Sequence, residues 1–358
     1  MEFGVSFPTY VRAYEDVRRA EDLGFSHAWF DDSHMCYSEL FSTMALAAHH
    51  SSRIRLGTFV LVPGNRIAPV VASAMATLNA IAPGRLILGV GAGFTGRNVM
   101  GFGPVARETI REHVEICRAL MAGREARYSE NGEERLIRFL HPDLGFVNVR
   151  DAIPIYVAAN APKMQELAGQ AADGWIYAGC DPEGVRHGLG NVINSAQVAG
   201  RSGAIREVVA LASACVLRPG DAVTSKRVIN RVGPHAMVGL HTYWRPGEIP
   251  VSMFGPPALR TLAERYHRDY IMRMRTPLEK RFQEIHLGHL IFLKPGEEAY
   301  VNEDLIRLMS VTGTRDEVLT RLKELENAGV NQFVVRIVGT DARETLQEFS
   351  REIIGHYC

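Results

Sequence analysis

The sequence predicts a (β/α)8 TIM barrel, and three observations carry that prediction. Short apolar runs rich in branched residues alternate with longer stretches of helical periodicity along most of the chain. There are about eight such runs, each followed by a helical stretch, which is the number that closes a barrel of this kind. The chain has 358 residues, about a hundred more than the roughly 250 that the barrel needs. Most of this surplus lies between residues 218 and 311, which predicts an insertion between the seventh and eighth strands of one domain, residues 1–358.

The order of the elements follows from this alternation. The first helix is predicted because Val17, Ala20 and Leu23 recur on one face and Gly24 can end it. Pro162 suits the first turn of a later helix. The expected strands are 3–8, 27–32, 54–62, 85–91, 153–159, 174–179, 208–217 and 332–338, and the expected helices are 11–23, 39–49, 70–81, 107–120, 162–172, 182–199, 315–328 and 344–354, with helical stretches 222–232 and 257–275 in the insertion and a polar excursion at 123–148.

The composition narrows the class of partner. Forty basic and forty acidic residues give a formal net charge of +0, so no global field would recruit nucleic acid or an anionic membrane. The five cysteines are scattered, and the first ten residues lack a basic stretch followed by an apolar one. We therefore expect a cytoplasmic protein that binds a small organic molecule, with no nucleic acid, membrane or metal partner.

A barrel carries its chemistry at the carboxyl ends of its strands, so polar residues there are candidate site residues. After the second strand stand Asp31, Asp32, Ser33 and His34, which could orient a ring, accept a proton or hydrogen-bond a substrate. The alternative is that Asp31 and Ser33 cap the next helix. Arg66, after the third strand, is a candidate anion ligand or part of an ordinary surface loop.

Four segments together show a more specific likeness. They are 20–32, 53–93, 153–176 and 311–335, and in order and spacing they resemble the bacterial luciferase-like superfamily of flavin- and deazaflavin-dependent oxidoreductases. The likeness is greatest to its methylenetetrahydromethanopterin reductase branch. Residues 217 to about 300 match only loosely.

The resemblance implies a cofactor site built from several strand ends. It places a cis peptide between the non-prolyl residues Phe59 and Val60, supporting the isoalloxazine or deazaflavin ring from behind, although Phe59 could also be plain core. It places the cofactor's phosphate-bearing tail at the start of the helix after the fifth strand, where free N–H groups point outward. The residues implied there are Ala159, Asn160 and Ala161, with Tyr177 and Ala178 as the next wall.

The glycine-rich loop 89–103 is not a dinucleotide fingerprint, because it follows a middle strand rather than opening a Rossmann unit. We interpret Gly91, Ala92 and Gly93 as backbone that approaches the flat ring, and Thr95 and Arg97 as hydrogen-bond donors to the cofactor tail. Deazaflavin-dependent relatives often carry an acidic residue where this chain has Phe94, which we expect to shield the ring and contact substrate.

Histidines at two places in the sequence are further candidates for the site. The family often reads Asp-His at the end of the second strand, whereas this chain reads Asp32-Ser33, with His34 following. His286 and His289 are three residues apart and are expected to line the substrate pocket; they would bind a metal only with further ligands that the sequence does not identify. The insertion also carries aromatic residues that form either its core or a pocket: Tyr243, Trp244, Phe254, Tyr266 and Tyr270.

Three functions remain open from the sequence. The first is hydride transfer between coenzyme F-420 (a 5-deazaflavin) and a small organic substrate, which the branch likeness favours. The second is an FMN-dependent monooxygenase using reduced flavin and dioxygen, which the absence of an acidic residue at position 94 favours. The third is a non-catalytic flavin-binding subunit. The family also implies a homodimer, and the apolar helix around Leu46 agrees with a contact there.

Overall fold

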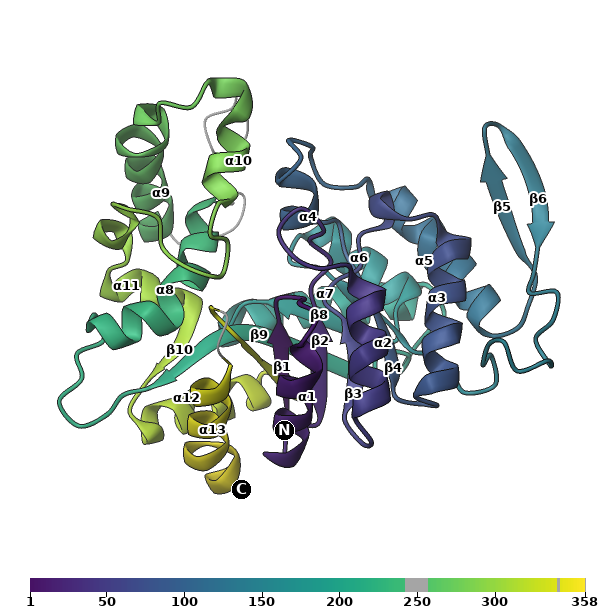
Figure 1. Cartoon of the computed structure of the whole chain (residues 1–358), viewed down its shortest axis with the longest axis horizontal. Helices are drawn as coiled ribbons and strands as arrows, with labels where there is room; N and C mark the ends of the chain where they lie inside the picture. Colours follow the sequence, from purple (N-terminus) through teal and green to yellow (C-terminus); the bar gives the residue numbers. More distant parts are fainter. Residues whose placement is uncertain (242–256, 340–341, 358) are drawn as a thin grey trace.

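A computed structural model describes residues 1–241, 257–339 and 342–357. Within these ranges, eight parallel strands close into a barrel (Figure 1), because β1 pairs with both β2 and β11, and β9 pairs with both β11 and β8. The strands are β1 (Glu2–Phe7), β2 (His27–Phe30), β3 (Arg55–Thr58), β4 (Leu86–Val90), β7 (Ile155–Ala158), β8 (Gly174–Ala178), β9 (Glu207–Val216) and β11 (Gln332–Arg336). The predicted (β/α)8 barrel is confirmed, with its strands in the expected order.

Helices surround the barrel, and three of the eight begin at a residue whose side chain caps the first turn. Asp181 accepts hydrogen bonds from the first turn of α7, and Thr314 with Glu317 forms a capping box at α12. The surrounding helices are α1 (Ala13–Asp22), α2 (Leu40–His50), α3 (Ala68–Ile81), α5 (Arg107–Met121), α6 (Pro162–Ala171), α7 (Pro182–Val198), α12 (Arg315–Asn327) and α13 (Arg343–Glu352). Each lies within two residues of its predicted bounds at both ends.

A hairpin and a short helix are among the elements that were not predicted. The polar excursion at 123–148 contains an antiparallel hairpin of β5 (Ala126–Glu130) and β6 (Glu133–Ile137). Its turn is Asn131-Gly132 with φ values of 53° and 83°, and an Asn-Gly pair is itself a hairpin signal. The short helix α4 (Phe94–Asn98) was missed because it directly follows the glycine-rich run.

The insertion folds into helices that stand beside the barrel (Figure 1). Its helix α8 (Lys226–His241) continues past the Gly233-Pro234 pair, at which the sequence prediction ended it. The insertion has its own apolar cluster, which includes Tyr266 stacked on Tyr270. Its other elements are α9 (Pro257–Asp269), α10 (Arg281–His286), α11 (Glu303–Met309), β10 (Ser310–Gly313) and the 3-10 turns η2 (Ile271–Arg273), η3 (Leu278–Lys280) and η4 (Glu297–Tyr300).

The remaining aromatic residues named for the insertion, Tyr243, Trp244 and Phe254, lie outside the described residues. The division into one domain with an insertion at about 218–311 stays a prediction. In the part of the chain that the structure describes, no helix combines the length and apolarity needed to cross a membrane.

A separate apolar cluster fills the barrel interior and forms the floor of its mouth. It contains eight buried side chains, with Val60 and Ala158 packed against it at the carboxyl ends of β3 and β7. Trp29 and Phe59 lie at its centre, with ring centroids 4.9 Å apart. The cluster consists of Trp29, Phe59, Ile87, Tyr156, Ile176, Val209, Leu211 and Val334.

Candidate active site

Asp31 ends β2 and forms a buried ion pair with Arg336 at the end of β11. Both carboxylate oxygens lie 2.7 Å from Arg336 Nη1, and the two side chains are 7 and 8% exposed. Burial raises the pKa of Asp31, and the contact with Arg336 offsets only part of that effect. The pair ties the second strand to the last one, so we assign Asp31 a positioning role.

Asp32 holds the segment that follows β3. Its carboxylate accepts hydrogen bonds from the Val62 backbone N–H at 3.1 Å, from Asn65 at 3.2 Å and from Arg66 at 2.9 Å. Arg66 also donates to Glu39 at 2.7 Å. Arg66 therefore binds two carboxylates of the protein itself. The alternative that Asp31 and Ser33 cap the next helix is wrong, because Glu39 caps α2.

Ser33 and His34 lie in the turn after β2. Ser33 is buried, and its carbonyl accepts the N–H groups of Cys36 and Tyr37. His34 is half-buried, with Nε2 3.3 Å from the sulfur of Met100 and with no hydrogen-bond partner at Nδ1 within the described ranges. Their predicted catalytic roles stay predictions.

The peptide bond between Phe59 and Val60 is cis, as the resemblance implied. The two side chains have different surroundings. Phe59 is 7% exposed in the barrel interior, with the Arg336 guanidinium 5.9 Å from its ring centroid. Val60 is half-buried, so it is Val60 rather than Phe59 that offers its side chain to the barrel mouth.

Gly91 and Gly93 bring the backbone of the loop after β4 close to Val60 and Val62 respectively. A Cβ at Gly91 would lie 2.5 Å from Val60 Cγ2 and 3.4 Å from Ala158 Cβ. A Cβ at Gly93 would lie 2.4 Å from Val62, and its φ of 81° is one that other residues rarely adopt. Gly91, Val60 and Ala158 therefore form a continuous small-residue surface, which we call the mouth wall.

The residues after these glycines contact the insertion. The Phe94 ring meets His286 edge to face with centroids 5.9 Å apart, and Thr95 Oγ1 lies 3.0 Å from His289 Nε2. Arg97 donates to the Gly103 carbonyl and stacks over Phe102. The predicted hydrogen bonds from Thr95 and Arg97 to a cofactor tail therefore compete with contacts within the protein. Half-buried Ala92 accepts from the Val105 N–H.

The ends of β7 and β8 are joined by Asn160. Its amide donates to the Ala178 carbonyl at 2.8 Å and accepts from the Ala178 N–H at 3.0 Å. Ala159 is buried and accepts from Trp175, while Ala161 is the N-cap of α6. Tyr177 is half-buried, and burial raises its pKa to about 12. These residues surround the predicted tail site, but a hydrogen bond from Asn160 to a phosphate stays a prediction.

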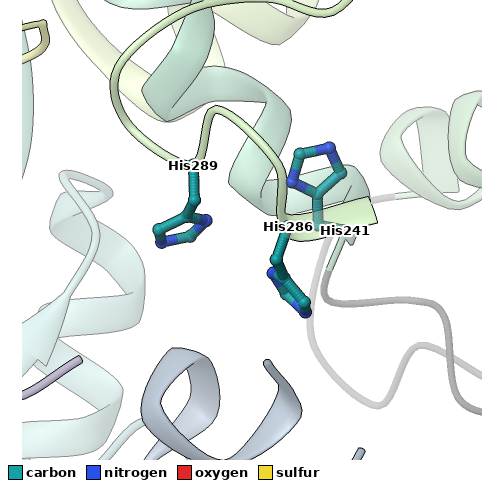
Figure 2. Close-up of side chains that lie close together, drawn as sticks. All are labelled: His241, His286 and His289. Atoms are coloured by element: carbon teal, nitrogen blue, oxygen red, sulfur yellow. The ribbon is translucent and has the colours of Figure 1, made fainter. Parts of the chain in front are cut away.

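His286 and His289 lie together with a third histidine that the sequence analysis did not single out. His241 is the last residue of α8, and one ring nitrogen of each histidine lies within 4.8 Å of the others (Figure 2). Burial lowers the pKa of His286 to about 3 and also lowers the pKa of His241 and His289. Each of these shifts favours the uncharged form of the imidazole. No sequence signal connects His241 to residues about 45 positions later.

Behind this group, which we call the three-histidine cluster, lies a buried ionic network. Glu297 accepts hydrogen bonds from His241 Nε2 at 3.0 Å, from Tyr266 at 2.6 Å and from the Lys294 N–H at 2.8 Å. The Lys294 ammonium lies 2.6 Å from the same carboxylate. Tyr37 donates to the His289 carbonyl at 2.6 Å, which fixes this part of the insertion against the loop after β2.

A cavity of about 640 Å³ lies elsewhere, between the insertion and α12. Leu262, Leu308, Val311 and Arg321 are among the residues that line it. It contains none of the residues at the strand ends described above, so it is separate from the candidate active site.

The sequence and the fold were compared with those of known proteins. Residues 4–332 match the family of luciferase-like monooxygenases. The chain is 30% identical to the 5,10-methylenetetrahydromethanopterin reductase of Archaeoglobus fulgidus over 365 residues, 99% of each protein. It is 35% identical over 172 residues to an F420-dependent glucose-6-phosphate dehydrogenase of Kineococcus radiotolerans, which is 44% of this chain and 49% of that protein.

A solved structure shows the same fold along the whole chain. The coenzyme F420 dependent tetrahydromethanopterin reductase of Methanopyrus kandleri superposes with a TM-score of 0.68 at 22% identity, covering 100% of this chain and 99% of the other. The family match and the full-length relative agree with the barrel fold. The chain therefore belongs to the luciferase-like monooxygenase family.

Proposed function

We propose that this protein is a deazaflavin-dependent oxidoreductase that transfers a hydride between coenzyme F-420 and a small organic substrate. The observation that carries the proposal is the mouth wall of Val60, Gly91 and Ala158, next to a non-prolyl cis peptide. Gly91 has no side chain and packs against Val60 and Ala158, so these two apolar side chains form the surface against which a flat ring would lie in this proposal. The relatives at 30 and 35% identity, a methylenetetrahydromethanopterin reductase and an F420-dependent dehydrogenase, support the deazaflavin.

The residues divide into three roles under this proposal. The mouth wall supports the ring, and the segment 159–161 with Tyr177 surrounds the tail at the start of α6. Phe94, His286 and His289 border the opposite side, where the insertion meets the loop after β4. When bound, the coenzyme supplies the hydride chemistry, and the protein orients the two reactants and excludes water.

Asp31 and Asp32 act on this site indirectly. Each carboxylate is held by an arginine of the protein, Arg336 and Arg66 respectively. We therefore propose that they fix the loops after β2 and β3 rather than accept a proton from substrate. Phe94 stands where deazaflavin-dependent relatives often carry an acidic group, and it shields the ring from solvent in this proposal.

The test is a titration of the purified protein with coenzyme F-420 and, separately, with FMN, followed by absorbance and fluorescence. Saturable binding of the deazaflavin, tighter than that of FMN, is the expected result. Preferential FMN binding together with oxygen consumption by the reduced flavin complex would instead identify a monooxygenase. Binding of neither would overturn both enzyme proposals.

A further inference from the structure

The three-histidine cluster has features of a ligand-binding site that is separate from the mouth wall. His241, His286 and His289 are 4, 5 and 5% exposed, and the Nδ1 atom of each has no hydrogen-bond partner in the described part of the chain. Leaving buried polar atoms unpaired costs about 1–3 kcal/mol each. Three such atoms in one place therefore point to a ligand that satisfies them together.

We propose that His241, His286 and His289 form a binding site for one divalent transition metal ion, with zinc as the ion that matches them best. Imidazole nitrogens are preferred ligands for zinc. In a tetrahedral zinc site the Zn–N distance is about 2.0–2.1 Å, which places ligand nitrogens roughly 3.4 Å apart. Nitrogens that now lie within 4.8 Å of one another need to move inward by roughly 1 Å, which side-chain rotation provides.

The surrounding hydrogen bonds orient two of the rings for this purpose. Glu297 accepts a hydrogen bond at 3.0 Å from His241 Nε2, and Thr95 Oγ1 lies 3.0 Å from His289 Nε2. Both contacts leave Nδ1 as the atom available to a metal. A carboxylate behind a ligating histidine is a recurrent feature of metal sites, because it fixes the tautomer and raises the basicity of the ring. Figure 2 shows the three rings arranged around a common space.

His286 completes the group from α10. Its ring packs edge to face against Phe94 on one side, and against His241 and His289 on the others, with centroids 6.1 and 5.7 Å away. The cluster thus joins two segments of the insertion where it meets the loop after β4.

Three protein ligands leave a fourth tetrahedral position free, as in catalytic zinc sites. Of the barrel residues that contact the cluster, Phe94 packs against the His286 ring and Thr95 contacts His289 Nε2, so the loop after β4 is the part of the barrel next to the metal site. A substrate oxygen, carbonyl or hydroxyl, is the chemical group that would occupy the fourth position, and the metal would polarise that oxygen. This second step rests on the proposed function, whereas metal binding itself does not.

The experiment uses full-length protein without an affinity tag and without coenzyme. The protein is treated with a chelator, dialysed against Zn²⁺ and analysed for metal content and for affinity by competition with a chromogenic chelator. We expect one zinc per chain. His286→Gln and His289→Gln should each lose this stoichiometric ion, while the exposed His187→Gln on α7 should retain it. Thermal unfolding of each variant establishes that it is folded.

A further variant tests the mechanism of binding without removing a ligand. Glu297→Gln should weaken zinc binding by about 10–100-fold, the usual effect of changing the partner of a ligating histidine. Substitution with Co²⁺ should give the intense visible spectrum of four-coordinate cobalt, and His289→Gln should abolish it. Absence of saturable binding, or stoichiometric zinc that survives both ligand substitutions, would overturn the proposal.

Failure of this proposal and failure of the proposed function are distinguishable. Zinc binding is measured on coenzyme-free protein, and coenzyme binding is measured on chelator-treated protein. Coenzyme binding without zinc binding refutes the metal site alone. Zinc binding without coenzyme binding leaves the metal site in place and refutes the deazaflavin function.

Discussion

Replacing Gly91 with alanine tests whether the mouth wall binds the coenzyme ring. The new Cβ would lie 2.5 Å from Val60 Cγ2 and 3.4 Å from Ala158 Cβ. Because an ordinary carbon–carbon contact is about 3.5–4.0 Å, the Val60 side chain must move by roughly 1 Å. Overpacking of this kind costs about 1–3 kcal/mol. If the displaced side chain enters the ring site and the coenzyme must push it back against the new Cβ, this cost falls on binding, and the Kd should rise by up to about 5–150-fold.

The assay is a fluorescence titration with coenzyme F-420, accompanied by thermal unfolding. Gly103→Ala is the matched control, since no atom lies within 4 Å of a Cβ at that position, and its affinity should be unchanged. Adding Val60→Ala to Gly91→Ala removes the clashing methyl group and should recover part of the affinity. Equal affinity in Gly91→Ala and Gly103→Ala would refute the assignment of this surface to the ring.

Three further predictions concern stability and assembly. Asp31→Asn leaves the Arg336 charge buried without its partner and should lower the free energy of unfolding, measured in urea, by about 3–5 kcal/mol. The double variant Asp31→Asn/Arg336→Met should recover much of this loss. A loss below about 1 kcal/mol in Asp31→Asn would contradict the positioning role of the pair. Burial lowers the pKa of His113 to about 4, below its unfolded value near 6.5, so stability is lost as the pH falls from about 6.5 to 4. His113→Leu should remove up to about 2 kcal/mol of that loss at about pH 5. If urea unfolding of this variant keeps the same pH dependence, His113 is not its source. Leu46 is 37% exposed on α2, and Leu46→Glu should convert a dimer to a monomer by light scattering; an unchanged mass would exclude this helix as the contact.

The fold was predictable because its signals are local. Each strand and helix of the barrel carries its own apolar period and its own ends, and Pro162 and Gly24 stand at helix boundaries as expected. Luciferase-like membership and an oxidoreductase function are confirmed by the family match and the full-length relative. The cytoplasmic location and the homodimer stay predictions.

The site was only partly predictable because its contacts join distant parts of the chain. The strand ends predicted that Asp31 and Asp32 lie at the barrel mouth, but nothing in the sequence indicated that Arg336 would pair with Asp31. His241 was missed for the same reason: it joins His286 and His289 only through the packing of the insertion. Side-chain partners depend on tertiary packing, which a local period does not encode.

The pairing of β9 with β10 bears on how such enzymes diverge. Ser310 of β10 lies beside Ser213 of β9, and the Leu217 N–H donates to the Gly313 carbonyl at 2.8 Å. Since strand residues are about 3.3 Å apart, this pairing puts the points at which the insertion leaves and rejoins the barrel roughly 10–15 Å apart. Barrel closure uses β8, β9 and β11 instead. This segment can therefore change in length without altering the pairing of the strands that close the barrel.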